Sequence, residues 1–341
     1  MPVEREPLVH IRTPTYRRGA ALRRCLESMR AQTWSNWVCD VFDDDPEASG
    51  AAICEEIGDG RISYHRNAPQ KYASANIDQC FSSANPRNAD YFCVVEDDNY
   101  ILPTFIEENI GACRRFDVGL VLRNQYVEFD SGTPNARLSS FGILDEMFVE
   151  RVYDADEFRL SLIPGIGVSN GGMFWSRDIA SPLEIGFSCS ATLQEYMRTF
   201  SIAEDIYVAM TPLAVWAQNG EQTTRDLGGR ASYLRRELDL KRAVQILQQE
   251  AWRLAESETK RAFLETDAFS YPARSRAGGL VKALITSQVG RLLNTREKIA
   301  LAGRGLLIRS AGQTPPDFQA FLASRAKLQD PVKGSGRGPV G

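Results

Sequence analysis

Histidine is scarce in this sequence, whose 341 residues include only His10 and His65. The seven cysteines are scattered, and none forms a CxxC pair with another. This argues against a structural zinc site or a disulfide framework and favours a reducing, cytoplasmic environment. No apolar run approaches the roughly 18 residues of a membrane-spanning helix. The opening residues, MPVEREPLV, lack the basic and then apolar pattern of a signal peptide, so we expect none.

Charge is nearly balanced over the whole chain, but it is unevenly divided along it. The formal net charge is −4, with 43% hydrophobic and 25% charged residues, which is ordinary for a globular protein. Residues 1–229 carry 20 basic and 34 acidic side chains, whereas residues 230–341 carry 20 basic and 10 acidic ones. The balances of −14 and +10 predict two parts with different roles.

Strand-like and helix-like segments alternate through the first 123 residues. This alternation is typical of βαβ units and predicts a mostly parallel sheet covered by helices on both faces. After it, the pattern predicts a short strand at 173–175, a helix that begins near Glu204, and a helix-rich region from about residue 230. The expected strands of the first part are 8–13, 37–42, 61–65, 91–95 and 118–123, and the expected helices are 18–31, 48–57, 72–84 and 103–115.

Polar or acidic residues follow three of the expected strands. They are Thr13–Tyr16, Asp43–Asp45 and Glu96–Asp98. Ligands of parallel α/β sheets bind beyond the carboxyl ends of the strands, so we expect these three segments to converge on one rim.

Each of these segments suits a different part of a nucleotide ligand. The carboxylates of Glu96–Asp98 suit a hard cation such as Mg²⁺ or Mn²⁺, and those of Asp43–Asp45 suit a ribose hydroxyl or a base N–H. Tyr16 could stack on a base, and the neighbouring arginines and Lys71 could meet phosphate. The alternative for each segment is a solvated turn.

Four blocks of the chain, in order, resemble glycosyltransferase family 2. They are HIRTPTYRRGAALRRCLESMRAQTWSNWVCDVFDDD, YFCVVEDDNYILPTFIEENI, SNGGMFWSRD and AEDIYVAM, and together they span about residues 8–212. The resemblance implies the GT-A fold, a Rossmann-like and mostly parallel central sheet with helices on both faces, followed here by a helical C-terminal extension. The chain departs from the family pattern at Arg17, where Asn is common, and at Glu96, where the first acid of the DxD motif is usually Asp.

The resemblance also implies roles for individual residues. Asp205 would be the catalytic base, Asp98 and Glu96 would bind the metal, and Asp44 would hold the base of the nucleotide. The other implied donor-binding residues are Pro14, Thr15, Tyr16, Lys71 and Asp97, and the implied acceptor-side residues are Gly171, Gly172 and Glu204.

The activity implied by the resemblance is sugar transfer with inversion. A nucleoside-diphosphate sugar, with a UDP-sugar favoured, would donate to a hydroxyl of a glycan or another acceptor, assisted by Mn²⁺ or Mg²⁺, in the synthesis of polysaccharide, glycolipid or other surface glycans. Two alternatives remain: a non-catalytic nucleotide-sugar binding module and a sugar-phosphate nucleotidyltransferase. The second is disfavoured because no glycine-rich GxGxR-type loop lies near the first strand. Nucleic acid is not an expected partner, because no recognised motif accompanies the basic charge.

The expected organisation is a catalytic domain over residues 1–228, with a donor part to about 125 and an acceptor part after it. A basic helical extension would follow over 229–328, and a disordered tail over 329–341. Within 280–293, six apolar residues from Val281 to Leu293 fall on one helical stripe amid basic residues. The stripe could lie on an anionic membrane, making the protein peripheral on the inner face, or it could pack on the catalytic domain.

Overall fold

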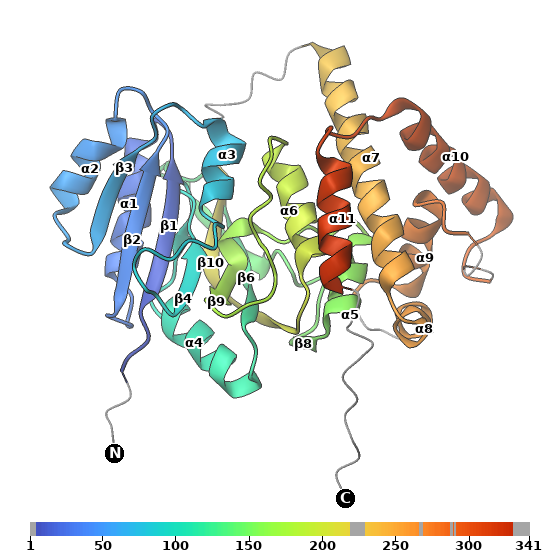
Figure 1. Cartoon of the computed structure of the whole chain (residues 1–341), viewed down its shortest axis with the longest axis horizontal. Coiled ribbons are helices and arrows are strands. Elements are labelled where there is room, and N and C mark those ends of the chain that lie inside the picture. The colour runs from blue at the N-terminus through green and yellow to red at the C-terminus, as the bar shows by residue number, and fades with distance from the viewer. Residues whose placement is uncertain (1–4, 219–228, 266–268, 287–288, 290, 330–341) are drawn as a thin grey trace, which may run out of the picture.

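A central ten-stranded sheet forms the body of the molecule (Figure 1). The computed structural model describes residues 5–218, 229–265, 269–286, 289 and 291–329. The tail predicted for 329–341 lies outside the described residues, except for Gln329, which ends the last helix. The strands are β1 (Val9–Thr15), β2 (Trp37–Asp43), β3 (Ile62–Arg66), β4 (Tyr91–Val94), β5 (Tyr100–Ile101), β6 (Leu120–Phe129), β7 (Arg137–Gly142), β8 (Arg151–Tyr153), β9 (Met173–Ser176) and β10 (Ile206–Gln218).

The strand order is β3-β2-β1-β4-β9-β6-β10-β5, with β7 paired to β6 and β8 paired to β10. Strands β3, β2, β1 and β4 are parallel neighbours, and β6 pairs in parallel with β10. Strand β9 lies between β4 and β6 and is antiparallel to both, so β3, β2, β1, β4, β6 and β10 point the same way. The remaining strands, β5, β7 and β8, are antiparallel to their partners. The predicted mostly parallel sheet is therefore confirmed, and its parallel strands share one carboxyl edge.

Helices cover both faces of the sheet and continue as a helical region beside it (Figure 1). The first helix shows why the sequence folds this way, because Leu22, Cys25, Leu26 and Met29 recur at helical spacing and are all buried. The longer helices are α1 (Gly19–Arg30), α2 (Ser49–Ile57), α3 (Tyr72–Gln79), α4 (Phe105–Phe116), α6 (Ala191–Ser201), α7 (Arg230–Leu254), α8 (Ser257–Glu265), α9 (Ala273–Lys282), α10 (Thr295–Ala311) and α11 (Phe318–Gln329), and the short ones are α5 (Ala155–Arg159), η1 (Leu160–Leu162) and η2 (Asn170–Gly172).

The prediction of a helix that begins near Glu204 is wrong. The helix lies earlier, as α6, and the residues after Asp205 form β10, the longest strand. Residues 206–218 (IYVAMTPLAVWAQ) combine β-branched and aromatic side chains with burial on both sides, which favours a central strand over a helix.

The C-terminal helices share a core with the segment before them. Phe269 lies 5.7 Å from Phe148 and 5.6 Å from Tyr153, measured between ring centroids, and all three rings are buried. Helix α6 packs against α7, joined by buried Met197 and Leu247 in one cluster. The division of the chain at residue 228 stays a prediction, and the helices pack directly on the body of the molecule (Figure 1).

The apolar stripe predicted for 280–293 is not one helix. Helix α9 ends at Lys282, and Leu284 has a left-handed backbone with φ of +64°. Val281, Val289 and Leu293 are buried in the core shared with the sheet. For these residues the packing alternative is correct. Among the described helices, none is long and apolar enough to cross a membrane.

Candidate active site

The loops after β1 and β4 meet at the carboxyl edge of the sheet. The Thr15 hydroxyl donates to Asp97 Oδ2 at 2.7 Å, and the Tyr16 backbone N–H donates to the same oxygen at 3.3 Å. Thr15 and Asp97 are both buried. The predicted convergence of these two strand ends is therefore present, and Asp97 is the link between them.

A cavity of about 280 Å³ opens at this meeting point. Its walls come from the β1–α1 loop, helix α3, the loop after β4, the first residue of α6 and the end of β10. The lining residues are Pro14, Thr15, Tyr16, Arg18, Ala73, Asn76, Ile77, Glu96, Asp97, Asp98, Ala191 and Trp216. Six of the predicted site residues line it, since Pro14, Thr15, Tyr16, Glu96, Asp97 and Asp98 are all in this set.

Arg18 is the cation among these carboxylates. Its guanidinium donates to Asp97 Oδ1 at 3.3 Å and also pairs with Asp98. Burial and the neighbouring Asp98 raise the pKa of Asp97 to about 6, against the opposing effect of Arg18. The cavity therefore brings three acidic side chains and one basic side chain to the position expected for a nucleotide ligand.

Glu96 sits beside these groups and is held by two amides. Asn99 donates to one of its carboxylate oxygens at 3.1 Å, and Asn170 donates to the other at 3.4 Å. Burial and the nearby Asp98 raise the pKa of Glu96 to about 7. Asn170 is in turn fixed by the fully buried Arg198, whose guanidinium donates to its Oδ1 at 2.9 Å.

Asp44 lies outside the cavity lining and holds the loop before α3. Its carboxylate accepts from the backbone N–H groups of Lys71 and Tyr72, both at 2.7 Å, and from the side chain of Asn67 at 3.0 Å. The Lys71 ammonium donates to Gln79 at 2.5 Å. Neither Asp44 nor Lys71 lines the cavity, so the structure places both beside the site rather than in its wall.

Gly171 and Gly172 lie in η2, directly before β9, where they are buried. A Cβ on Gly172 would lie 2.6 Å from the carbonyl oxygen of Arg123, so only glycine allows this approach to β6. An equivalent Cβ on Gly171 would lie 3.8 Å from the amide nitrogen of Asn99. Gly171 thus lies near Asn99 and Gly172 lies against β6, and the cavity lining does not include either glycine.

Glu204 and Asp205 lie at the other edge of the sheet. They precede β10, whose first residue, Ile206, pairs with Leu120 at the start of β6. Burial and the nearby Asp154 raise the pKa of Asp205. Because parallel strands start opposite the edge where they end, the structure does not bring this predicted base to the cavity.

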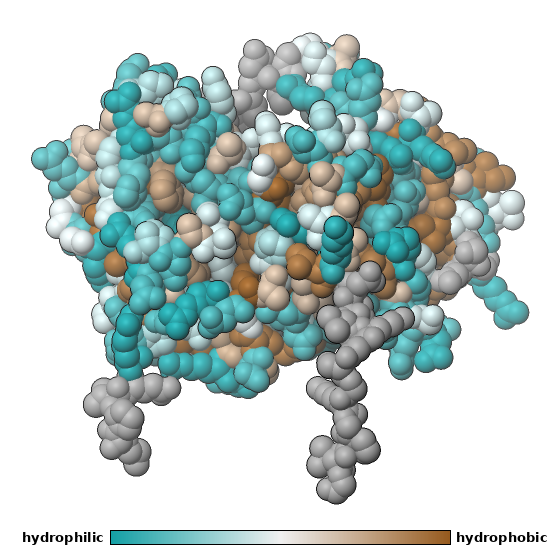
Figure 2. Space-filling model, viewed as in Figure 1, coloured by the Kyte–Doolittle hydropathy of each residue, from teal (hydrophilic) through white to brown (hydrophobic). Residues whose placement is uncertain are grey.

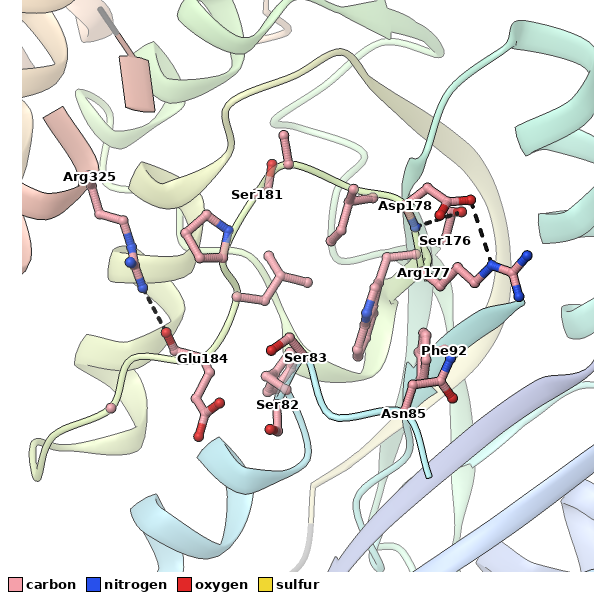
Figure 3. A pocket seen from close by; sticks show the side chains of 17 residues that line it. Ser82, Ser83, Asn85, Phe92, Ser176, Arg177, Asp178, Ser181, Glu184 and Arg325 are labelled. Atoms are coloured by element: carbon pink, nitrogen blue, oxygen red, sulfur yellow. Dashed lines mark hydrogen bonds and ion pairs between the residues drawn. The ribbon is translucent and has the colours of Figure 1, made fainter. Parts of the chain in front are cut away.

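Glu204 instead fixes the wall of a second cavity, of about 560 Å³, shown in Figure 3. Its Oε1 accepts from the backbone N–H groups of Ala180 and Ser181 and from the Ser181 hydroxyl, at 2.8 to 2.9 Å. The rest of the wall includes Phe92 of β4 and Arg325 of α11. The predicted acceptor-side role of Glu204 is thus separated from the carboxylate cavity, and its contacts are those of a loop anchor.

The acidic residue that the sequence prediction missed is Glu195 of α6. Ala191, one helical turn earlier on the same face, lines the carboxylate cavity, and Arg198, one turn later, binds Asn170 beside Glu96. Burial and the nearby Glu96 carboxylate raise the pKa of Glu195 to about 8, with Arg198 opposing. The signal available in the sequence was the spacing of Glu195 and Arg198 on an amphipathic helix.

Trp216 is the large aromatic side chain of the cavity. It lies near the carboxyl end of β10 and is 43% exposed, which is unusual for tryptophan in a strand with a buried core. It shares the cavity with Asp98 and Tyr16. An exposed aromatic face beside acidic groups is suited to stacking on a sugar ring or a base.

The donor set of the cavity fits a hard divalent cation. Glu96 and Asp98 present carboxylate oxygens two residues apart, and each lies near enough to raise the pKa of a neighbouring acid. In the part of the chain that the structure describes, no group of three or more His, Cys, Asp or Glu side chains is placed to hold a metal ion. An ion held by these two residues would complete its shell with water and ligand phosphate oxygens.

A comparison of the sequence with known protein families shows which family the chain resembles. The family described as Glycosyl transferase family 2 matches residues 11–181, which is half of the chain. The chain belongs to this family. The matched segment contains the β1–α1 loop and the Glu96–Asp98 acids, and it ends before both Glu195 and Asp205.

One curated protein is similar to this chain in sequence, and several solved structures are similar to it in fold. Glycosyltransferase GlyA of Streptococcus pneumoniae serotype 4 (strain ATCC BAA-334 / TIGR4) is 25% identical over 143 residues, which cover 41% of this chain. The match spans only 19% of the length of that relative. Crystal structures of S. aureus TarS 1–349 have the same fold. One of them has a TM-score of 0.52 at 12% identity and covers 94% of this chain and 91% of its own. The UDP-GlcNAc complex has a TM-score of 0.53 at 12% identity and covers 94% and 88%.

Proposed function

We propose that this protein is a glycosyltransferase that moves a sugar from a nucleoside-diphosphate donor to an acceptor hydroxyl, with inversion at the sugar carbon. The observation that carries the proposal is the meeting of the Thr15–Tyr16 loop with Asp97 and Asp98 at one cavity, in a chain of this family. The role of a glycan as acceptor, and of the product in polysaccharide, glycolipid or other surface-glycan synthesis, belongs to the same proposal.

The proposed donor is a UDP-sugar. The support is that one structural neighbour was solved in complex with UDP-GlcNAc and another with UDP. In this chain Pro14, Thr15 and Tyr16 would line the nucleotide pocket, and Asp97 would meet the ribose or the sugar. Asp44 and Lys71 would act indirectly, by fixing the loop before α3 beside the pocket.

The diphosphate carries the negative charge that must be stabilised for the donor to react. Arg18 lies in the cavity and pairs with Asp97 and Asp98. Its guanidinium would therefore be close enough to pair with the diphosphate of a bound donor. Asp98 and Glu96 would hold a divalent ion, Mn²⁺ or Mg²⁺, which stabilises the leaving diphosphate when it is bound.

We propose Glu195, in place of Asp205, as the base that takes the proton from the acceptor hydroxyl. A base works best with a pKa near the working pH, and the pKa of about 8 meets this condition. Attack from the side of α6, opposite the leaving group, would give inversion in one displacement. Trp216 would stack on the acceptor, with Gly171 and Gly172 packed behind the neighbouring wall.

A thermal-shift screen tests the donor. The chain would be melted with uridine, guanosine, adenosine and cytidine diphosphates and with UDP-sugars, each with Mn²⁺ and with EDTA. We expect a uridine nucleotide to raise the melting temperature most, and EDTA to reduce the shift, because a ligand at 100 times its Kd adds about 2.7 kcal/mol to the stability of the folded state. An absence of stabilisation by every nucleotide would overturn the proposal.

One observation favours the binding-module alternative. The Arg18 guanidinium already pairs with Asp98, one of the two carboxylates that the metal would need. Release of UDP from UDP-sugars, measured with Mn²⁺ and with EDTA, separates the two functions. Metal-dependent release supports the transferase, whereas tight nucleotide binding without release in either condition supports the binding module.

A further inference from the structure

Helix α10 presents an apolar face that nothing covers among the described residues. Its side chains Ile299, Leu306 and Leu307 are 68%, 57% and 58% exposed. Figure 2 shows hydrophobic residues gathered at the right-hand end of the molecule, in the place of α10 in Figure 1. At about 100° per residue, these three lie on one side of the helix together with Ala300 and Gly303, and we call these five residues the α10 face.

The opposite side of α10 is fixed firmly on the molecule. Gly305 approaches the carbonyl oxygen of Lys282 so closely that an added Cβ would lie 2.4 Å from it. Gln245 of α7 is buried and donates to the carbonyl oxygens of both Lys282 and Gly305, at 3.1 and 3.0 Å. The helix therefore cannot turn its apolar face inward without breaking these contacts.

Basic side chains border the α10 face on both sides. Arg304 lies along one border, Lys298 and Arg309 lie along the other, and Arg296 lies at the amino-terminal end of the face. The acid of this helix, Glu297, lies on the same side as Arg304 and pairs with the exposed Arg274. Exposed apolar side chains flanked by long basic side chains are suited to contact with the headgroup region of an anionic bilayer.

We propose that the α10 face docks this protein on an anionic lipid surface. The apolar residues would enter the boundary of the acyl chains, and the bordering arginines and Lys298 would meet lipid phosphates. This inference does not depend on the donor or the catalytic residues. It also differs from the stripe expected at 280–293, whose apolar residues are used in the core.

A second copy of the chain is a poorer occupant of this face. A twofold dimer would place the same surface on both sides and oppose like charges at both borders. The helix has 17 residues, so its outer ridge is about 25 Å long and about 10 Å wide. That gives roughly 250 Å² per partner, well below the roughly 800 Å² of a stable interface.

Co-sedimentation of the full chain with vesicles tests the proposal. Vesicles of phosphatidylcholine alone would be compared with vesicles of equal parts phosphatidylcholine and phosphatidylglycerol, at low and at high salt. We expect binding to the mixed vesicles alone, weakened by salt. The double substitution Leu306→Ser with Leu307→Ser should lower the partition coefficient at least tenfold, and Arg304→Gln with Arg309→Gln should do the same.

Matched controls carry the same changes elsewhere on the surface. Leu138→Ser with Phe141→Ser alters side chains that are 48% and 51% exposed on β7, and Arg114→Gln with Arg115→Gln removes two exposed charges of α4. Both should bind vesicles like the unchanged protein. Equal binding by the α10 variants and the unchanged chain would overturn the proposal. So would a concentration-dependent dimer, seen by light scattering, that the Leu306→Ser/Leu307→Ser variant abolishes in a chain that binds no vesicles.

Discussion

At the scale of single residues, the place of a carboxylate in the fold says more about its role than the sequence motif that contains it. Glu195 and Asp205 are ten residues apart, yet α6 brings the first near Glu96, whereas the second directly precedes β10 at the far edge of the sheet. Both acids have a raised pKa, so the pKa alone does not choose between them. Their surroundings do, because Glu195 lies near the Glu96 carboxylate of the cavity, whereas Asp205 lies near Asp154. Neither acid is itself among the residues that line the cavity.

Replacement of Glu195 by Gln should lower sugar transfer by about 10² to 10⁴ while nucleotide binding stays within about twofold of the unchanged protein. The reason is that the amide keeps the shape of the side chain but cannot take a proton. The matched control is Asp205→Asn, which should transfer at close to the normal rate. Initial rates and a nucleotide titration measure both. Near-normal transfer by Glu195→Gln, or a large loss in Asp205→Asn, would return the role to Asp205.

The raised pKa of Glu195 predicts how kcat/KM for sugar transfer depends on pH. Its pKa is raised to about 8, so the carboxyl group is protonated at neutral pH and becomes a base as the pH rises. We therefore expect kcat/KM to increase with pH and to level off above about pH 8. A pH profile of kcat/KM at constant ionic strength checks this. A profile that is flat from about pH 6 to pH 9 would contradict the assignment.

At the scale of elements, α6 is fixed by a buried ion pair. The guanidinium of Arg198 is fully buried and donates to Asp78 at 2.8 Å, and Asp78 also accepts from the backbone N–H groups of Ile185 and Gly186. This pair joins α6 to α3 and to the loop before α6. A pair so enclosed costs much when one partner is lost, since the other charge stays behind without compensation.

Asp78→Ala should lower the free energy of unfolding by about 3–5 kcal/mol, because Arg198 would remain buried and unpaired. Glu237→Ala is the control, since Glu237 pairs with Lys241 on the outside of α7 and its loss should cost at most about 0.5 kcal/mol. Urea denaturation of the three proteins provides the values. A loss of less than about 1 kcal/mol in Asp78→Ala would contradict the prediction, because it would mean that water compensates the charge of Arg198.

The elements of the sheet could be predicted because their patterns are local. The strand–helix alternation and the polar strand ends place Thr15, Asp97 and Asp98 on one rim with no knowledge of packing. Glu195 could not be found that way, since it is brought near Glu96 by a helix whose orientation depends on contacts with η1, α3 and α7. The same limit explains the mistaken helix at Glu204, where a Glu–Asp pair precedes a buried strand instead.

At the scale of the whole molecule, one charge cluster joins three strands and the chain before β4. Asp40 of β2 interacts with His10 of β1 at 2.8 Å, with His65 of β3 at 3.0 Å and with Arg87. Burial alone would raise the pKa of Asp40, but the hydrogen bonds from His10, Arg87 and His65 hold it well below its usual range. Burial also lowers the pKa of His10.

Both shifts make the folded state less stable in acid. A histidine with a lowered pKa loses stability as the pH falls below about 6.5, and an aspartate with a lowered pKa loses it below about pH 4. We expect the free energy of unfolding, measured in urea, to fall in two stages between about pH 7 and pH 3. In Asp40→Asn the stage below about pH 4 should shrink, whereas Glu6→Gln, at the exposed start of the described chain, should keep both stages. An unchanged acid stage in Asp40→Asn would refute the assignment.

The packing of α6 on the C-terminal helices links these helices to the proposed base, Glu195, although they do not line the cavity. Leu193, Met197 and Phe200 of α6 are buried against Leu247 of α7 and Phe321 of α11. None of the residues that line the carboxylate cavity comes from α7 to α11. If the chain were shortened after β10, the helix that carries Glu195 would lose its support on one side. The helical region thus supports the helix that carries the proposed base, and we expect a chain shortened after β10 to lose that support.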